Sequence, residues 1–406
     1  MHNRYSQAID PMNTSFENTE NAFAYKSTKE LKEAKLIFKT MGYQPLIDLG
    51  VRLTPLAIKL RLPIRRLVRR TIFKQLVGGE TLEQTAAVAA MLGHYGVKVI
   101  LDYGVEGKVG EAGFEQATEK FIRVIEYAAT QPNIPFVSLK VTGLARFGLL
   151  QRLNEAPRIR SGIHDNEAEA EEWENVRERM YRICAVAEEK NVGVLIDAEE
   201  SWIQDPIDRI TMEMMEEFNQ EKAIVFNTIQ LYRHDRLHFL NLSYRIAQQK
   251  GFVLGVKLVR GAYMEKERAR AAAKGVASPI QTTKEDTDKD FDTAVEFCLD
   301  RIENISCVVA SHNEHSNSHA IKLMTEKSIS HDHPHMHFSQ LYGMSDNITF
   351  NLAKAGYSVS KYLPFGPLKD VVPYLMRRAE ENSSVSGQTG REYELIKKEL
   401  LRRGAK

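Results

Sequence analysis

Eight short apolar runs, each followed by a stretch of helical composition, fill the chain from residue 97 onward. Strands that are apolar along most of their length are typical of a parallel sheet covered by helices on both faces. Eight strand–helix units in about 270 residues match the size of a (βα)8 barrel. The runs are residues 97–102, 136–141, 192–197, 224–230, 253–259, 307–311, 335–341 and 357–362.

The runner-up fold is a doubly wound open sheet. That fold usually carries Gly-x-Gly-x-x-Gly after its first strand, whereas here the glycines are Gly104, Gly107 and Gly110, which have the wrong spacing. We therefore predict an α/β protein, a distorted (βα)8 TIM-type barrel with an N-terminal helical segment. The predicted divisions are a mobile tail (1–30), the helical segment (31–95), the barrel (96–390) and a C-terminal helix (391–406).

Composition excludes several classes of function. A formal net charge of +1 gives no reason to expect nucleic acid, and no apolar run is long enough to span a membrane. The first thirty residues have the pattern of neither a signal nor a transit peptide. Cys184, Cys298 and Cys307 are widely spaced in apolar segments, where buried thiols are expected. These features favour a cytoplasmic protein.

A basic patch lies within the predicted helical segment. Lys59, Arg61, Arg65, Arg66, Arg69 and Arg70 alternate with bulky apolar residues. This pattern suits an amphipathic helix on an anionic membrane, which would place the protein peripherally on the inner face of the cytoplasmic membrane. A solvated helical face is the alternative, and the sequence leaves both open.

Polar residues follow each apolar run. In a (βα)8 barrel the active site lies at the C-terminal ends of the strands, so these residues are expected to converge there. They include Asp102 with Glu106 beyond it, Lys140, Asp197, Gln230, Lys257, Ser311, Gln340 and Tyr362.

The segment after the last run supplies two adjacent cations. A helix expected to open at Pro373 carries Arg377 and Arg378 about 100° apart, and Glu381 can pair with Arg377 at i,i+4 spacing. Two forked guanidinium groups suit one small carboxylate. An exposed salt-bridge ladder is the alternative.

Two other clusters are candidates for ligand binding. Lys257 and Arg260 beside Gly261 suit a phosphate-bearing cofactor, because a glycine lets the ligand approach the backbone. The histidine tract 331–337 lacks accompanying metal ligands and is interpreted as a polar lead-in to the seventh strand, so no metal is expected.

Four motifs together resemble the FAD-dependent proline dehydrogenases, over residues 97–382. They are Lys257-Leu-Val-Arg-Gly-Ala-Tyr-Met264, Asp197-Ala-Glu199, Ser311-His312-Asn313 and Tyr374-x-x-Arg377-Arg378-x-x-Glu381-Asn382. The helical N-terminus and the run Gln340-Leu-Tyr-Gly-Met344 look closer to the stand-alone, mitochondrial-type enzymes than to the bifunctional bacterial ones.

The resemblance implies a barrel that binds FAD and oxidises L-proline to Δ1-pyrroline-5-carboxylate, with hydride passing from proline C5 to flavin N5 and electrons going on to a quinone. Asp197 and Lys257 would lie at the flavin core as catalytic residues. Substrate would contact Lys140, Tyr362, Tyr374, Arg377 and Arg378, with Glu106 as a gate and Glu381 orienting the arginines. The implied cofactor ligands are Ala198, Gln230, Lys257, Arg260, Gly261, Ala262, Thr282, Ser311, His312, Asn313 and Gln340.

Two positions depart from the bifunctional enzymes, which have arginine at the position of Lys257 and tryptophan at that of Met264. Two functional alternatives stay open. One is a hydroxyproline dehydrogenase of the same fold, although the bulky Tyr362 is expected to exclude a ring hydroxyl. The other is a non-catalytic, membrane-docking barrel, which should have lost the cations at Lys257 and Arg260.

Overall fold

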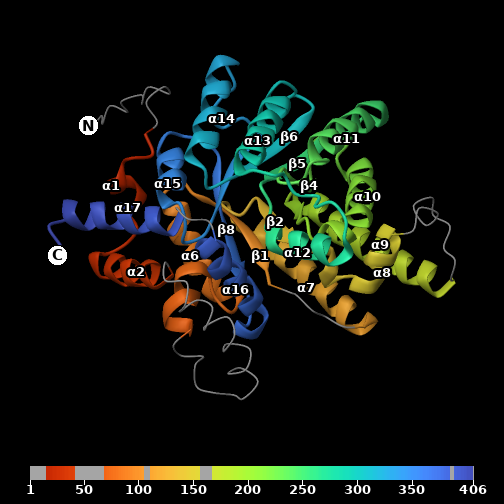
Figure 1. Cartoon of the computed structure of the whole chain (residues 1–406), viewed down its shortest axis with the longest axis horizontal. Helices are drawn as coiled ribbons and strands as arrows, with labels where there is room; N and C mark the ends of the chain where they lie inside the picture. Colours follow the sequence, from red (N-terminus) through yellow and green to blue (C-terminus); the bar gives the residue numbers. More distant parts are fainter. Residues whose placement is uncertain (1–14, 42–67, 105–109, 156–166, 385–387, 406) are drawn as a thin grey trace.

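The computed structural model describes residues 15–41, 68–104, 110–155, 167–384 and 388–405. Its centre is a closed barrel of eight parallel strands arranged in chain order (Figure 1). The strands are β1 (Lys98–Tyr103), β2 (Phe136–Leu139), β3 (Gly193–Ile196), β4 (Val225–Gln230), β5 (Leu254–Val259), β6 (Ile305–Ala310), β7 (Met336–Leu341) and β8 (Val359–Phe365).

The barrel confirms the predicted fold class. β1 pairs with β8 as well as with β2, which closes the sheet and rules out the open, doubly wound alternative. Every predicted run overlaps an observed strand. The largest differences are that β6 begins at Ile305 and that β8 continues through Pro364 to Phe365.

Helices surround the barrel between successive strands (Figure 1). They are α7 (Glu111–Ala129), α8 (Phe147–Glu155), α9 (Glu167–Lys190), α10 (Ser201–Phe218), α11 (Arg236–Lys250), α12 (Met264–Lys274), α13 (Lys284–Leu299), α14 (Glu314–Glu326), α15 (Asp346–Lys354) and α16 (Leu368–Ser384), with a single 3₁₀ turn, η3, at Val141–Gly143. Most of them place an apolar stripe on the sheet in one continuous core, whereas the buried face of α16 belongs to a second core cluster.

The prediction that the last barrel helix opens at Pro373 is wrong. α16 begins at Leu368 and contains Pro373 in its second turn. A proline inside a helix removes a hydrogen bond. Burial of Leu368, Val371 and Val372, each at most 7% exposed, offsets that loss.

An apolar cluster fills part of the barrel interior. Ile100, Leu195, Phe226 and Val308 form it, and Phe136 packs against them. Gly193 makes room for this layer, because an added Cβ there would lie 2.4 Å from the Phe136 ring. His337, which pairs in register with Val308, also points inward and lies edge-on to the Phe136 ring at 5.1 Å between centroids, so the barrel interior is filled at this level.

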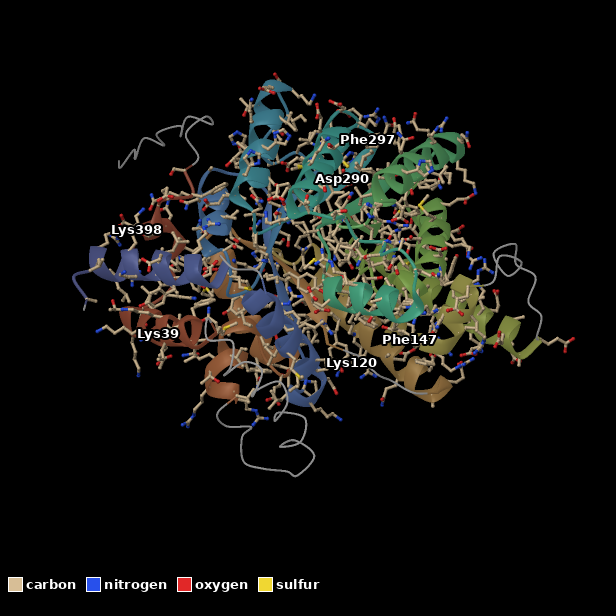
Figure 2. The ribbon with its side chains drawn as sticks, viewed as in Figure 1. Lys39, Lys120, Phe147, Asp290, Phe297 and Lys398 are labelled. Carbon is tan, nitrogen blue, oxygen red and sulfur yellow. The ribbon has the colours of Figure 1, made fainter. Side chains whose placement is uncertain are left out.

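The two ends of the chain pack together beside the barrel. The N-terminal elements are α1 (Thr19–Ala22), α2 (Thr28–Met41), a π-helical turn η2 (Arg69–Phe73), α5 (Lys74–Leu76) and α6 (Leu82–His94), and the C-terminal helix is α17 (Gln388–Arg402). α2 packs on α17, and α1 packs on α15. Lys39 of α2 and Lys398 of α17 mark this pair in Figure 2.

The described part of the predicted tail is packed on the protein. Residues 15–30 contain α1 and the start of α2, and Phe23 is 1% exposed in a second core cluster. The three cysteines are buried, as expected. Among the described residues, none of the helices combines the length and apolar composition that a membrane span requires.

Candidate active site

One buried carboxylate organises the C-terminal end of the barrel. Asp197, which directly follows β3, accepts hydrogen bonds at Oδ1 from Lys257 Nζ (2.5 Å) and Ser138 Oγ (2.7 Å). Its Oδ2 accepts from Lys140 Nζ (2.8 Å) and from the hydroxyl of Tyr362 (2.8 Å). Four donors from three strands of the barrel and their ends therefore hold one carboxylate.

The alternation of side chains along strands explains this convergence. Ser138 lies in β2 and Lys140 just beyond it, two residues apart, so both point into the barrel. Lys257 lies in β5 and Tyr362 in β8, each at an inward position. The ammonium of Lys257 also lies 5.5 Å from the centroid of the Tyr362 ring, which fixes the ring face toward a cation.

The Asp197 cluster carries a fixed charge pattern. Burial alone would raise the pKa of the Asp197 carboxyl, but Lys140 and Lys257 hold that pKa well below its usual value. Burial raises the pKa of the Tyr362 hydroxyl, and Asp102 and Asp197 raise it further. Asp197 is therefore an anion and Tyr362 a neutral donor across the physiological range.

A pocket opens beside this cluster at the ends of β1, β2 and β8. Its lining includes Asp102, Lys140, Tyr374 and Arg377. Arg378, the next residue, has its guanidinium carbon 5.5 Å from the centroid of the Tyr374 ring. The structure thus brings together the predicted substrate residues from β2, β8 and α16.

Two predicted site residues fall outside the described part of the chain. Glu106 lies in the undescribed range 105–109. Glu381 belongs to α16, but its side chain is outside the described part of the chain. Their roles stay predictions.

A second polar centre lies at the ends of β5 and β6. Arg260 donates from Nε to Asp288 Oδ1 (2.7 Å), from Nη1 to Ser311 Oγ (2.8 Å) and from Nη2 to Ser316 Oγ (2.9 Å). Its guanidinium carbon stacks 4.4 Å from the centroid of the Phe291 ring. Hydrogen bonds at its edges and the Phe291 ring on its face therefore hold the Arg260 guanidinium in one orientation.

A tightly packed glycine and an unpaired polar atom lie beside Arg260. Gly261 has φ +141°, and an added Cβ would lie 2.4 Å from the Tyr232 ring. Gln230 is 2% exposed and donates to the Glu199 carbonyl (3.2 Å), but its Oε1 has no hydrogen-bond partner in the structure. Buried polar atoms are normally paired, so Oε1 points to a ligand donor.

Other predicted cofactor residues already have partners in the protein. Gln340 donates to Ser311 O (3.2 Å) and accepts from Thr349 Oγ1 (2.8 Å). His312 contacts Ser345 through Nδ1 (2.8 Å), and Asn313 caps α14 by accepting at Oδ1 from the backbone N–H of His315 (2.8 Å). These side chains shape the turn between β6 and α14.

The remaining predicted cofactor residues are small side chains. Ala198 is 8% exposed and lies two residues beyond the end of β3, and Ala262 is half-buried and lies three residues beyond the end of β5. Thr282 is exposed, two residues before α13.

The sequence interpretation missed two groups in the site. Ser138 is a polar residue inside an apolar run, two positions before Lys140, and that spacing could have identified it. Glu199 belongs to the Asp197-Ala-Glu199 motif, but the sequence interpretation assigns it no functional role. It is 4% exposed, its oxygens accept from the N–H (3.1 Å) and Oγ1 (2.6 Å) of Thr142, and burial raises its pKa to about 7.

The histidine tract makes structural contacts. His331 stacks on Tyr357 at 4.2 Å between ring centroids, His335 Nδ1 lies 2.7 Å from the Ile302 carbonyl, and His337 Nε2 lies 2.7 Å from Ser360 Oγ. Within the described ranges, no three His, Cys, Asp or Glu side chains are grouped so that they could hold a metal ion.

Comparisons of the chain with a family profile and with known proteins point to the same family. The profile of the family described as proline dehydrogenase matches residues 85–391. The carbapenem antibiotics biosynthesis protein CarD of Pectobacterium carotovorum is 38% identical over 80% of this chain and 83% of that protein. Mitochondrial proline dehydrogenase 1 of Dictyostelium discoideum is 31% identical over 95% of this chain and 74% of that protein.

Two further comparisons bear on substrate and fold. Hydroxyproline dehydrogenase of Xenopus laevis is 33% identical over 94% of this chain and 88% of that protein. The crystal structure of proline utilization A from Bdellovibrio bacteriovorus matches with a TM-score of 0.70 at 20% identity, over 95% of this chain. This chain spans 40% of that protein, and the likeness shows the shared barrel fold.

Proposed function

The chain belongs to the proline dehydrogenase family, and from this premise we propose that it oxidises L-proline to Δ1-pyrroline-5-carboxylate with FAD as cofactor and a quinone as electron acceptor. The observation that carries the proposal is the Asp197 carboxylate, held by Lys257, Lys140, Tyr362 and Ser138 beside the Arg377 pocket.

The chain has residues that fit FAD. Gln230 has an unpaired buried oxygen, Arg260 provides a fixed cation nearby, and the exposed Gly261 beside it carries no side chain that would keep a ligand from the backbone. We assign the cofactor to these residues and to Ala198, Lys257, Ala262, Thr282, Ser311, His312, Asn313 and Gln340. When bound, FAD supplies the atom that accepts the hydride from proline C5.

Lys257 and Asp197 provide preorganised charge at this point. The ammonium of Lys257 is fixed by Asp197 at 2.5 Å, so it needs no reorientation as negative charge develops next to it. A lysine donates from one point rather than through a fork, so charge rather than bidentate geometry carries its role.

The cations that line the pocket beside the cluster suit the carboxylate of an amino acid. Arg377 and Lys140 line it together, and with Arg378 they provide cations for a carboxylate. Tyr362 and Tyr374 provide apolar ring faces for the pyrrolidine ring. Glu106 is assigned as a gate over the pocket and Glu381 as the residue that orients the arginine pair.

Hydroxyproline is the second candidate substrate, because one relative is named a hydroxyproline dehydrogenase. Tyr362 argues against it. Its hydroxyl is bonded to Asp197 at 2.8 Å, so the ring is held in place and cannot turn aside for a ring hydroxyl without losing that bond. We therefore propose proline as the preferred substrate.

Transfer to a quinone requires access to a membrane. We assign this contact to the basic patch that begins at Lys59 and ends with Arg69 and Arg70, and propose a cytoplasmic protein bound peripherally to the inner face of the cytoplasmic membrane. Arg69 is paired with Glu80, while residues 59–67 lie outside the described ranges. Co-sedimentation with anionic vesicles at low and high salt tests the attraction, which should disappear at high salt.

The decisive test of the activity is spectroscopic. Purified protein should be yellow, and anaerobic L-proline should bleach the flavin band, with trans-4-hydroxy-L-proline bleaching it more slowly. Adding a short-chain quinone should restore the colour. A colourless protein that does not bind added FAD would support the non-catalytic, membrane-docking alternative instead.

A further inference from the structure

The C-terminal helix reaches the candidate cofactor turn through two contacts. Glu392 of α17, 5% exposed, accepts a hydrogen bond at Oε1 from the backbone N–H of Ser345 (2.6 Å). The preceding residue, Arg391, forms an ion pair with Glu314, the first residue of α14. Glu314 directly follows Asn313. The helix α17 therefore contacts both the residue after the turn that contains His312 and the Ser345 loop that packs on that turn.

Ser345 has an unusual backbone conformation. It lies in the left-handed region (φ +50°, ψ +43°), which strains a residue with a Cβ and persists where the surroundings hold it. Lys361, which is 0% exposed, donates to the carbonyl of Met344 at 2.6 Å, and Gln75 donates to that of Gly343 at 3.0 Å. The loop before Ser345 is thus clamped from the barrel and from the N-terminal segment.

The Ser345 hydroxyl is directed at His312. Ser345 occupies the N-cap position of α15, where a serine usually accepts a hydrogen bond from the first turn, yet its side chain makes no such bond. Instead its Oγ lies 2.8 Å from His312 Nδ1. A glycine would adopt this backbone conformation more easily, so contact with His312 explains a serine at this position.

The contacts of His312 define its tautomer. The backbone N–H of Leu341 points to Nε2 at 3.5 Å, so Nε2 carries the lone pair and Nδ1 carries the proton donated to Ser345. Burial, and then Lys361, lower the pKa of His312 to about 3. The ring is therefore neutral, with one orientation.

We propose that Glu392 and Ser345 are positioning residues for the flavin, acting through His312: the C-terminal helix fixes the Ser345 loop, and the Ser345 hydroxyl fixes the histidine ring at the cofactor turn. This inference rests on the proposed function, in which residues 311–313 hold FAD. It assigns α17 a part in cofactor binding, in addition to its packing against α2.

Ser345→Gly is the sharpest variant, because it relieves the backbone strain while it removes the hydroxyl. We expect a folded protein whose FAD dissociation constant rises about tenfold, the equivalent of one buried hydrogen bond, with an altered visible circular dichroism of the flavin. Ser328→Gly is the matched control: its φ is +54°, but it is exposed beyond the end of α14. It should leave both readouts unchanged.

A conservative and a non-conservative substitution of Glu392 together test its role. Glu392→Gln keeps an oxygen acceptor for the Ser345 N–H and should bind FAD within about twofold of wild type, whereas Glu392→Ala should weaken FAD binding about as much as Ser345→Gly. FAD binding and flavin dichroism equal to wild type in both Ser345→Gly and Glu392→Ala would overturn the inference.

A readout without FAD separates this inference from the proposed function. Urea unfolding of His312→Ala, Glu392→Ala and the double variant measures their coupling. Non-additive effects support the link even if the wild-type protein binds no FAD, a result that would defeat the proposed function alone. Strictly additive effects would overturn the link, whatever the cofactor.

Discussion

Two buried lysine–aspartate pairs lie at the same end of this barrel, and they differ in what surrounds them. Lys257 and Asp197 are 2.5 Å apart, and the other partners of Asp197 are side chains beside a pocket. Lys361 and Asp346 are 2.9 Å apart, and Asp346 also binds Tyr25 and Lys26 near the N-terminus.

The difference shows that a buried ion pair does not by itself indicate catalysis. The Lys361 pair connects β8 and α15 to the N-terminal segment, and Lys361 uses its remaining donors on backbone carbonyls. The charge of Asp346 is neutralised inside the protein by Lys361 and Lys26. The Lys257 pair places its charge beside the pocket, where it can act on a reacting group. Substitutions should therefore change stability at one pair and rate at the other.

The largest expected effect is on stability, at Lys361. Lys361→Met leaves Asp346 buried without its closest cation, which should lower the free energy of unfolding by about 3 to 5 kcal/mol. Urea denaturation measures this, with exposed Lys354→Met as control. A loss below about 1 kcal/mol would mean that Tyr25 and Lys26 suffice to hold Asp346, and would remove the structural half of the comparison.

The next effect is on substrate binding, at the pocket. Arg377→Met or Arg378→Met should weaken proline binding by about 2 to 4 kcal/mol while FAD stays bound, because each guanidinium is assigned to a desolvated carboxylate. Titration of the flavin spectrum with proline measures it, with exposed Arg245→Met as control. Unchanged proline affinity in both variants would place the carboxylate site elsewhere.

A smaller effect is the pH dependence of stability from Glu199. Its pKa is raised to about 7 from 4.5, so the folded state holds a proton that the unfolded state releases between those values. Its stabilisation is thus complete below pH 4.5 and lost as pH rises to 7. Glu199→Gln should remove a decline on the order of 2 kcal/mol between pH 5 and 8.

Urea denaturation at several pH values tests this prediction. Glu392, whose burial also raises its pKa to about 7, titrates over the same range, so the Glu199→Gln protein should keep part of the slope. A variant whose slope equals that of the wild type would show that Glu199 is ionised in the folded protein throughout.

The smallest effect is at the assigned gate. Glu106→Ala should weaken proline capture by about 1 kcal/mol without abolishing flavin reduction, because an ion pair at a gate is partly exposed. A double-mutant cycle with Arg377→Met measures their coupling. Additive effects would show that the two side chains do not meet.

Much of the fold was predictable because the positions of the strands depend on local patterns, and eight alternating strand–helix units are typical of a closed barrel. The apolar runs located all eight strands, and the strand-end motifs identified the family, which the comparisons confirm. Asp197, Lys140, Lys257 and Tyr362 were predicted together, because side-chain alternation brings strand-end residues to one place.

The errors and omissions concern tertiary packing. The start of α16 was misplaced at Pro373, since local rules give a proline in a helix a high cost while burial of Leu368 and Val371 outweighs it. The contact from Glu392 to Ser345 spans 47 residues, and that from Ser345 to His312 spans 33. No local spacing rule predicts such pairs, so the link from α17 to His312 could be found only in the structure.

The central claim is that the Asp197–Lys257 pair acts on the rate of proline oxidation rather than on folding or substrate affinity. The most direct test is the limiting rate constant of anaerobic flavin reduction at saturating L-proline in Lys257→Met, measured by stopped-flow absorbance. We expect a fall of about 10²-fold, with proline affinity near that of the wild type. A wild-type limiting rate accompanied only by weaker proline binding would contradict it.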